Sequence, residues 1–109
     1  MSYVQIEIGG RARGLKFNQM AMEIMYQHYV EDSTAGNVYA MVYAGLRGNS
    51  YVKSEQPDYT LEQVCDWVDE ISVKDPGLIK QVEDAMTSTE IFKELIKKGE
   101  ENKKKVKKK

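Results

Sequence analysis

Two short strands joined by a tight turn are indicated by the segment Tyr3-Val-Gln-Ile-Glu-Ile-Gly-Gly-Arg-Ala-Arg-Gly-Leu-Lys-Phe17. Its apolar residues Val4, Ile6 and Ile8 alternate with polar ones, which is the period of a half-buried strand. The glycine-rich middle supplies residues that tolerate positive φ at a turn, and the alternation then resumes. Because an isolated two-stranded hairpin is marginal in water, we expect this one, over about residues 3–17, to pack against helices.

Two helices are predicted after the hairpin, over about residues 18–31 and 34–47. Asn18 suits the N-cap of the first helix. The apolar residues of that helix form two stripes, which implies burial on both sides or a docking surface. The second helix is apolar nearly all round and is predicted to stop where Gly48 fits the C′ position. A polar loop is expected to follow over residues 50–59.

A third helix, over about residues 60–72, has the clearest N-terminal signal in the chain. Thr60 and Gln63 have the spacing of a capping box, and Tyr59 and Val64 that of a hydrophobic staple. The helix that follows is amphipathic, with an apolar stripe on one side and acidic side chains on the other.

The last helical region is predicted over about residues 76–98. Asp75 suits its N-cap and Pro76 its first position. A second capping-box pattern, Thr87 with Glu90, predicts that the helix restarts near residue 88. The predicted fold class is therefore mainly α, a small helical domain with an N-terminal β-hairpin. No internal repeat is present.

Charge divides the chain into two parts. Residues 97–109 hold eight of the sixteen basic residues, so residues 1–96 carry eight basic and fifteen acidic groups, a formal charge of −7. The Lys-rich segment has one apolar side chain, Val106, and cannot bury enough surface to offset its ordering entropy. We therefore expect one domain over residues 1–96 and a disordered basic tail over residues 97–109.

The composition favours a soluble, cytoplasmic protein. Hydrophobic residues make up 41% of the chain and charged residues 30%, both ordinary values. The apolar run Val38–Leu46 is nine residues long, against about 20 needed to span a bilayer, so no membrane association is expected. The N-terminus lacks the pattern of a secretory signal, and the lone Cys65 excludes an internal disulfide.

The catalytic inventory is small. His28 is the only histidine and lies on an apolar helix stripe, which favours a structural role, and Cys65 fits a small, partly buried hydrophobic residue. One Cys and one His cannot form a closed zinc site within one chain. Four acidic residues could in principle hold a hard cation, but a solvated helix face explains them better; they are Asp66, Asp69, Glu70 and Asp75. No catalytic, cofactor or metal site is expected, and an enzyme is the least favoured class.

Aromatic and methionine side chains favour a binding protein. The chain has seven Tyr, one Trp and six Met, and both Tyr and Met are common at adaptable interfaces. Ordinary core filling is the competing explanation. The hypothesis is that the partner-contacting positions include Met22, Tyr26, Tyr29, Tyr39 and Tyr43.

Three interpretations of the basic tail remain open. It could contact nucleic-acid phosphates or anionic lipid, although it has no interleaved aromatic residues for base stacking and is attached to an acidic body. It could be a solubilising tail. Finally, lysine is encoded by AAA or AAG, so the two Lys-Lys-Lys runs require A-rich tracts in the message, which are candidate slippery sites for the ribosome.

The sequence resembles the tail assembly chaperones of long-tailed bacteriophages and prophages over roughly residues 3–72. The resemblance is one of pattern and has no catalytic signature. The segments that carry it are Ile6-Glu-Ile-Gly-Gly10, Arg13-Gly-Leu-Lys-Phe-Asn18, Tyr43-Ala-Gly-Leu-Arg-Gly48 and Thr60-Leu-Glu-Gln-Val-Cys-Asp-Trp-Val68.

The resemblance implies a small helical protein of the host cytoplasm that is absent from the mature virion. Such chaperones bind and solubilise the tape measure protein and help to recruit tail tube subunits. Many exist in a second, longer form made by programmed frameshifting near the end of the first reading frame, where an A-rich slip site would encode lysines. Self-association remains open. No binding residue is transferred from the family, and the alternative is a small nucleic-acid-binding or regulatory protein that uses the Lys-rich tail.

Overall fold

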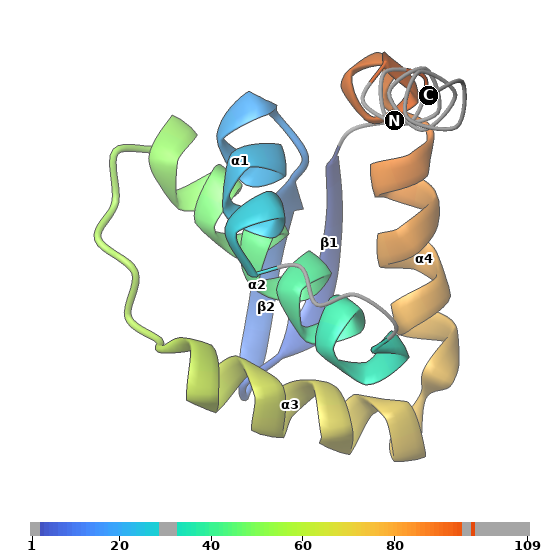
Figure 1. Ribbon diagram of the computed structural model, residues 1–109. Helices are drawn as coiled ribbons and strands as arrows, with labels where there is room; N and C mark the ends of the chain where they lie inside the picture. Colours follow the sequence, from blue (N-terminus) through green and yellow to red (C-terminus); the bar gives the residue numbers. More distant parts are fainter. Residues whose placement is uncertain (1–2, 29–32, 95–96, 98–109) are drawn as a thin grey trace.

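The fold is built on a two-stranded hairpin and one long helix. The computed structural model describes residues 3–28, 33–94 and 97. Its elements are β1 (Tyr3–Ile8), β2 (Arg11–Lys16), α1 (Gln19–His28), α2 (Thr34–Val52), α3 (Leu61–Lys74) and α4 (Pro76–Thr87), as Figure 1 shows. A further helical segment begins at Glu90. The mainly α architecture with an N-terminal hairpin is confirmed.

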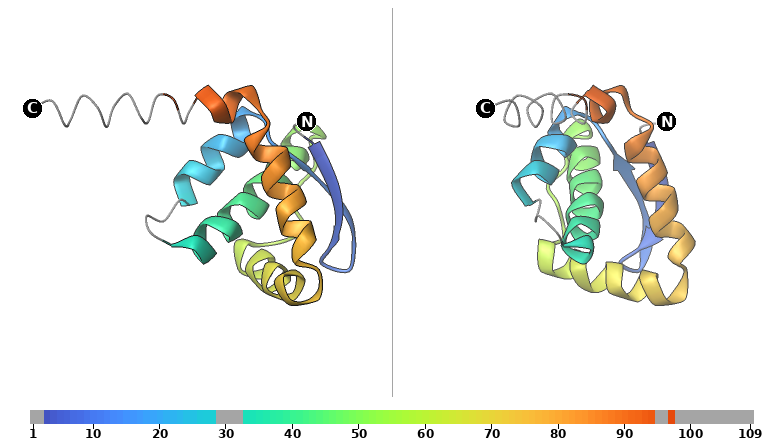
Figure 2. Two further views of the ribbon diagram at one scale, coloured as in Figure 1. Left: turned by 90° about the vertical axis from the view of Figure 1, so that its right-hand side faces the viewer. Right: turned by 45° about the vertical axis from the view of Figure 1, so that its right-hand side comes forward.

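Helix α2 is the central element, since it contacts β2, α1, α3 and α4. Figures 1 and 2 show α1 packed along α2, α4 running beside β1, and α3 passing the turn end of the hairpin. The core lies between the hairpin and these helices. Its buried residues are Ile6, Ile8, Leu15, Phe17, Ala21, Met22, Ile24, Met41, Val42, Ala44, Leu46, Tyr59, Val64, Val68, Ile71, Val82, Ala85 and Met86. No helix within the described part of the chain is both long and apolar enough to cross a membrane.

The predicted hairpin is confirmed. β1 and β2 are antiparallel, with Ile8 opposite Arg11 next to the turn and Tyr3 opposite Lys16 at the other end. The two turn residues have positive φ, +64° at Gly9 and +83° at Gly10, as the favoured two-residue turn requires. The alternation of the sequence therefore places one face of the hairpin in the core and the other in solvent.

The predicted N-cap of α1 is confirmed as well. Asn18 accepts a hydrogen bond from the backbone N–H of Ala21 through its Oδ1, at 2.9 Å. The helix is described as far as His28. Its predicted end near residue 31 lies outside the described residues, as does the predicted disordered tail except for Lys97, which is helical.

The predicted end of α2 is wrong. The helix continues through Gly48 to Val52, so the loop that follows begins at residue 53 instead of 50. Gly48 is needed for packing, because a Cβ there would overlap the backbone carbonyl oxygen of Lys16. The helix ends in a Schellman motif whose left-handed residue is Ser54, at φ +56°. In this motif the N–H of Glu55 bonds to the carbonyl of residue 50 at 2.9 Å.

Helix α3 begins as predicted and ends two residues later than predicted, at Lys74. Both capping-box bonds are present: the N–H of Gln63 donates to Thr60 Oγ1 at 3.2 Å, and the N–H of Thr60 donates to Gln63 Oε1 at 2.9 Å. The staple residues Tyr59 and Val64 are both buried. This cap fixes where α3 starts relative to the loop before it.

In the C-terminal region the predicted start of α4, with Asp75 at the N-cap and Pro76 as the first helical residue, is confirmed, whereas the predicted Thr87 cap is wrong. Asp75 holds the N-cap position of α4, but at ψ 76° its side chain makes no capping bond. The predicted break near residue 88 is confirmed, yet Thr87 lies inside α4 and the cap of the next helix is Thr89. The buried Thr89 hydroxyl accepts from the N–H of Phe92 at 3.1 Å and donates to the carbonyl of Met86 at 2.8 Å. One hydroxyl therefore joins the two helices.

Candidate partner-binding site

The five residues proposed as partner contacts do not share one environment. Tyr26 is 82% exposed, whereas Met22 is only 6% exposed. Tyr39 and Tyr43 are half-buried, and Tyr29 lies outside the described residues. The sequence pattern therefore grouped an exposed side chain with core and core-edge positions.

Tyr43 belongs to an aromatic series that joins α1, α2 and the loop before α3. Its ring makes edge-on contacts with His28, at a centroid distance of 5.5 Å, and with Tyr59, at 6.3 Å. Arg47 donates a hydrogen bond from Nη1 to the Tyr43 hydroxyl at 2.6 Å. Tyr43 and His28 thus hold helices together, which favours a structural role for both.

Tyr39 connects α2 to α3. Its hydroxyl donates to Oδ1 of Asp69 at 2.5 Å, and this hydrogen bond is the main cause that raises the pKa of Tyr39 above its ordinary value. An apolar hollow of about 250 Å³ lies beside this contact and includes Val38 and Ile79. Tyr39 is accessible at the rim of this hollow, but its hydroxyl is already occupied.

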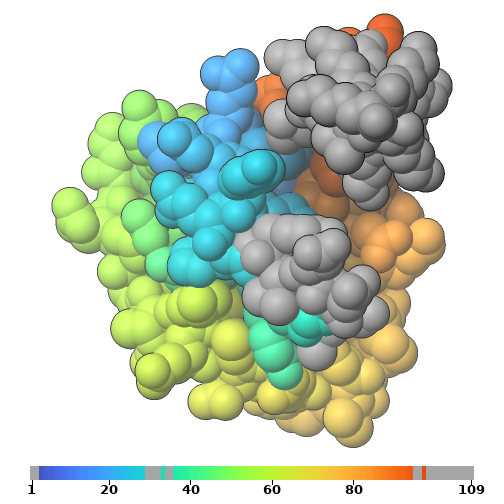
Figure 3. Space-filling view, in the orientation of Figure 1, coloured from blue at the N-terminus to red at the C-terminus, as the bar shows by residue number. Residues whose placement is uncertain are grey.

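A groove between α1 and the segment after α4 brings Met22 and Tyr26 together with Ile91. It has a volume of about 450 Å³, and the rest of its lining is Gln19, Glu23 and Gln27. Figure 2 shows the start of α1 next to the C-terminal helical segment, and Figure 3 shows the side chains of α1 at the surface of that face. The sequence indicated an apolar stripe at Ile91 but did not place it opposite α1. Tyr26, the most exposed of the described residues that were predicted as partner contacts, therefore lies in a groove with two further apolar side chains.

A second feature, which is not among the predicted sites, surrounds Arg13. Its side chain is 10% exposed, and its guanidinium carbon lies 4.7 Å from the ring centre of Trp67 and 5.6 Å from that of Tyr59. Its Nε donates to the carbonyl of Ile8 at 3.0 Å. Its Nη1 donates to Oδ1 of Asp58 at 2.9 Å. Arg13 therefore fastens the loop before α3 to the hairpin.

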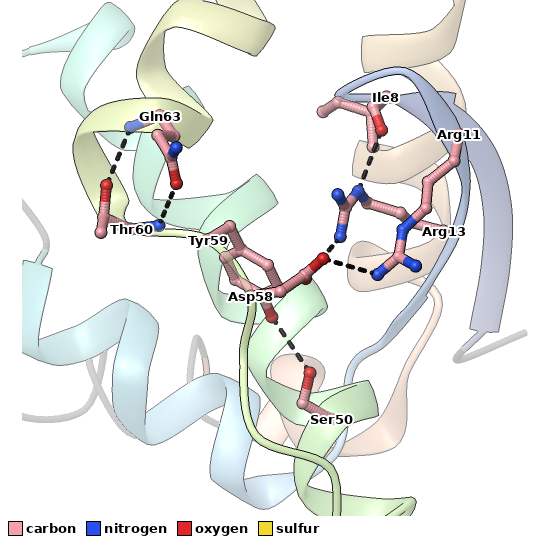
Figure 4. Close-up of polar contacts among 8 residues, drawn as sticks. All are labelled: Ile8, Arg11, Arg13, Ser50, Asp58, Tyr59, Thr60 and Gln63. Atoms are coloured by element: carbon pink, nitrogen blue, oxygen red, sulfur yellow. Dashed lines mark hydrogen bonds and ion pairs between the residues drawn. The ribbon is translucent and has the colours of Figure 1, made fainter.

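Asp58 bridges two arginines of β2, as Figure 4 shows. Besides Arg13 it accepts a hydrogen bond from Nη2 of Arg11 at 2.8 Å, and Arg11 is 62% exposed. The hydrogen bond from Arg13 is the main cause that lowers the pKa of Asp58 below its ordinary value.

The Asp58 pKa gives a testable acid dependence. Because folding lowers this pKa, the ionised carboxylate stabilises the folded state; that contribution is present above the ordinary carboxyl pKa and is lost as pH falls through the lowered one. We expect the Tm of Asp58→Asn to fall less than that of the wild type between about pH 7 and about pH 2, by a few degrees at most, since exposed ion pairs contribute little. Thermal melts followed by circular dichroism, with Glu55→Gln as the control, would measure it. If the Tm of Asp58→Asn fell with pH as much as that of the wild type, the lowered pKa of Asp58 would be contradicted.

The remaining candidates from the sequence are the Cys65 thiol and the acidic residues proposed as possible cation ligands. Burial, followed by the charges of Asp69, Asp66 and Glu62, raises the pKa of the Cys65 thiol, which disfavours the nucleophilic thiolate. Glu70 pairs with Lys74 at 2.9 Å. Within the described ranges, no three His, Cys, Asp or Glu side chains are grouped as metal ligands.

Comparison with protein-family models, with curated proteins and with solved structures gave no match to this chain.

Proposed function

We propose that the protein is a tail assembly chaperone of a long-tailed bacteriophage or prophage, which binds and solubilises the tape measure protein and helps to recruit tail tube subunits. It would act in the host cytoplasm and be absent from the mature virion. The observation that carries the proposal is the groove at Tyr26, since a holdase needs exposed, adaptable apolar surface. The resemblance of residues 3–72 to such chaperones supplies the identity of the client.

The surroundings of the groove suit this role. Met22 forms its floor, Tyr26 and Ile91 offer large apolar area, and Glu23 with two glutamines keeps the rim polar. An apolar centre with a polar rim is the usual anatomy of a transient interface. The acidic body, at −7 over residues 1–96, would keep a complex with an aggregation-prone client in solution.

Replacement of Tyr26 tests the proposed client surface. We expect Tyr26→Ala to weaken binding of the tape measure protein at least about tenfold, because exposed tyrosines at interface centres often contribute that much. Tyr51→Ala is the matched control, since Tyr51 is 63% exposed and lies outside the groove. The measurement is the soluble fraction of co-expressed tape measure protein and its co-purification with the full chain. If both variants retain the client equally, this groove is not the client site; if the wild type does not solubilise the client, the chaperone proposal itself fails.

The alternative function is tested in the same preparation. A nucleic-acid-binding protein would bind DNA or RNA through residues 97–109, with an affinity that falls steeply with salt and is lost on their deletion. The chaperone proposal expects a tape measure gene downstream and an A-rich slip site near codons 103–109. A message without such a tract would remove the proposed frameshifted form but not the chaperone role.

A further inference from the structure

The groove at Tyr26 follows one face of α1. The α1 residues that line it are spaced at i, i+3, i+4, i+7 and i+8, so they form one stripe along the helix; they are Gln19, Met22, Glu23, Tyr26 and Gln27. The helical rise makes this stripe about 12 Å long. Ile91 lies across from it, in the helical segment that begins at Glu90. The groove is therefore an open helix face with a second helical segment beside it.

A helical segment of a partner suits this face better than an extended one. Inside α1 the backbone N–H and C=O groups bond to one another, so the helix offers no ladder to an added strand. An extended segment would turn its own backbone groups toward Met22 and Ile91, whose side chains form no strong hydrogen bond. A helix has its backbone bonds satisfied and can place an apolar stripe of the same spacing in the groove.

Glu23 gives this face its charge. It is exposed, and it is the only charged residue among the described residues that line the groove. Within the described part of the chain it forms no ion pair, and α1 contains no lysine or arginine. The surrounding body, residues 1–96, carries −7. Charge complementarity therefore favours a partner with a basic residue beside its apolar stripe.

Two occupants from the chain itself fit less well. The Lys-rich tail has the complementary charge, but Val106 is its only apolar side chain, too little to fill a groove of about 450 Å³. A second copy would bring the same stripe, Glu23 included, and a second body of −7. A basic, amphipathic helix of another protein meets both requirements.

We propose that the groove at Tyr26 binds an amphipathic helix of the partner protein, with bulky apolar residues at i, i+3 and i+7 and a lysine or arginine that pairs with Glu23. This binding mode rests on the proposed function, in which the groove is the client site, and it specifies the kind of client segment that binds there. Met22 and Ile91 contact the apolar side chains, and Tyr26 covers them from the solvent side.

The test measures the binding of two labelled peptides to the full chain by fluorescence anisotropy. The basic peptide is acetyl-Leu-Ala-Ala-Leu-Lys-Ala-Lys-Leu-Ala-Ala-Leu-Lys-Ala-Lys-Leu-Ala-Ala-Leu-amide, which is long enough to form a helix. The acidic peptide has Glu in place of every Lys. The wild type should bind the basic peptide at least about threefold more tightly than the acidic one. The ¹³C shifts of the bound basic peptide should be helical.

Substitution of Glu23 tests the charge preference. Glu23→Lys should weaken binding of the basic peptide at least about tenfold and strengthen binding of the acidic one, because an attraction becomes a repulsion. Glu7→Lys is the matched control, since it changes the net charge equally at an exposed position of β1 outside the groove. Tyr26→Ala should weaken binding of both peptides.

Four results would contradict this binding mode. Equal binding of the two peptides by the wild type, or equal effects of Glu23→Lys and Glu7→Lys, would exclude recognition of charge by Glu23. Extended ¹³C shifts of the bound peptide would exclude a helix. In sedimentation of the free chain, a dimer that Tyr26→Ala dissociates would identify a second copy as the occupant.

The co-expression experiment separates this binding mode from the chaperone proposal. If Tyr26→Ala loses the tape measure protein but the wild type does not distinguish the peptides, the client site stands and its preference for a basic helix is wrong. If Tyr26→Ala loses the basic peptide but retains the tape measure protein, the helix site stands and the client proposal fails.

Discussion

Gly48→Ala should lower the free energy of unfolding by about 2–3 kcal/mol, although alanine is the better helix former by about 1 kcal/mol. Gly48 lies inside α2 where the helix crosses the end of β2. A Cβ at this position would overlap the backbone carbonyl oxygen of Lys16 and come within 2.9 Å of the Cβ of Ala21. Neither neighbour can rotate away, because one is backbone and the other is a buried methyl group. The helix would have to move from the hairpin.

A glycine elsewhere in the protein provides the control. Gly77 is in the first turn of α4, and the nearest atom to a Cβ there is Oδ1 of Asp75, at 3.3 Å. Because that oxygen is at the end of a flexible side chain, Gly77→Ala should be neutral or stabilise by up to about 1 kcal/mol. Urea unfolding of both variants, followed by circular dichroism, gives the comparison. Equal effects would mean that α2 does not approach β2 as closely as described.

Gly48 also shows where prediction from the sequence reaches its limit. Local patterns found the hairpin, the Asn18 cap and the Thr60 capping box, because each depends on residues within a few positions of one another. A glycine after an apolar run has two explanations, a helix end or a close approach by another element. Only the position of Lys16, 32 residues earlier in the chain, distinguishes them. The Schellman motif that ends α2 after Val52 has Ser54 instead of a glycine at its left-handed position.

The candidate site was harder to predict for the same reason. Tyr26 and Tyr43 both lie on helical apolar stripes, and nothing in their local sequence separates the exposed ring from the one packed against Tyr59. Arg13 was placed in a turn-and-strand pattern, and its stacking on Trp67 joins residues 54 positions apart. The one local signal for the contacts around Arg13 was the alternation of charged residues in β2, which places Arg11 and Arg13 on the same face.

Phe17→Ala should have the largest effect of the single substitutions considered, a loss of about 3–5 kcal/mol in the free energy of unfolding. Phe17 follows β2 and is 1% exposed. Its ring packs against α2 where Gly45 leaves space for it. Removing the ring would leave a cavity between the hairpin and the central helix. Since domains of this size have only about 5–10 kcal/mol of stability, the milder Phe17→Leu is needed as a measurable companion.

A second substitution tests whether the loss arises at this contact. A Cβ on Gly45 would lie 2.8 Å from Cζ of Phe17 and 2.9 Å from Cβ of Leu15, so Gly45→Ala should destabilise the wild type. In the Phe17→Leu background the ring atom is gone and only the contact with Leu15 remains, so Gly45→Ala should cost less there, with a coupling of about 1 kcal/mol. Denaturant unfolding of the four proteins in the cycle measures this coupling. Additive effects would show that Phe17 stabilises the fold through other neighbours. The main packing contact between the hairpin and α2 would then lie elsewhere along β2.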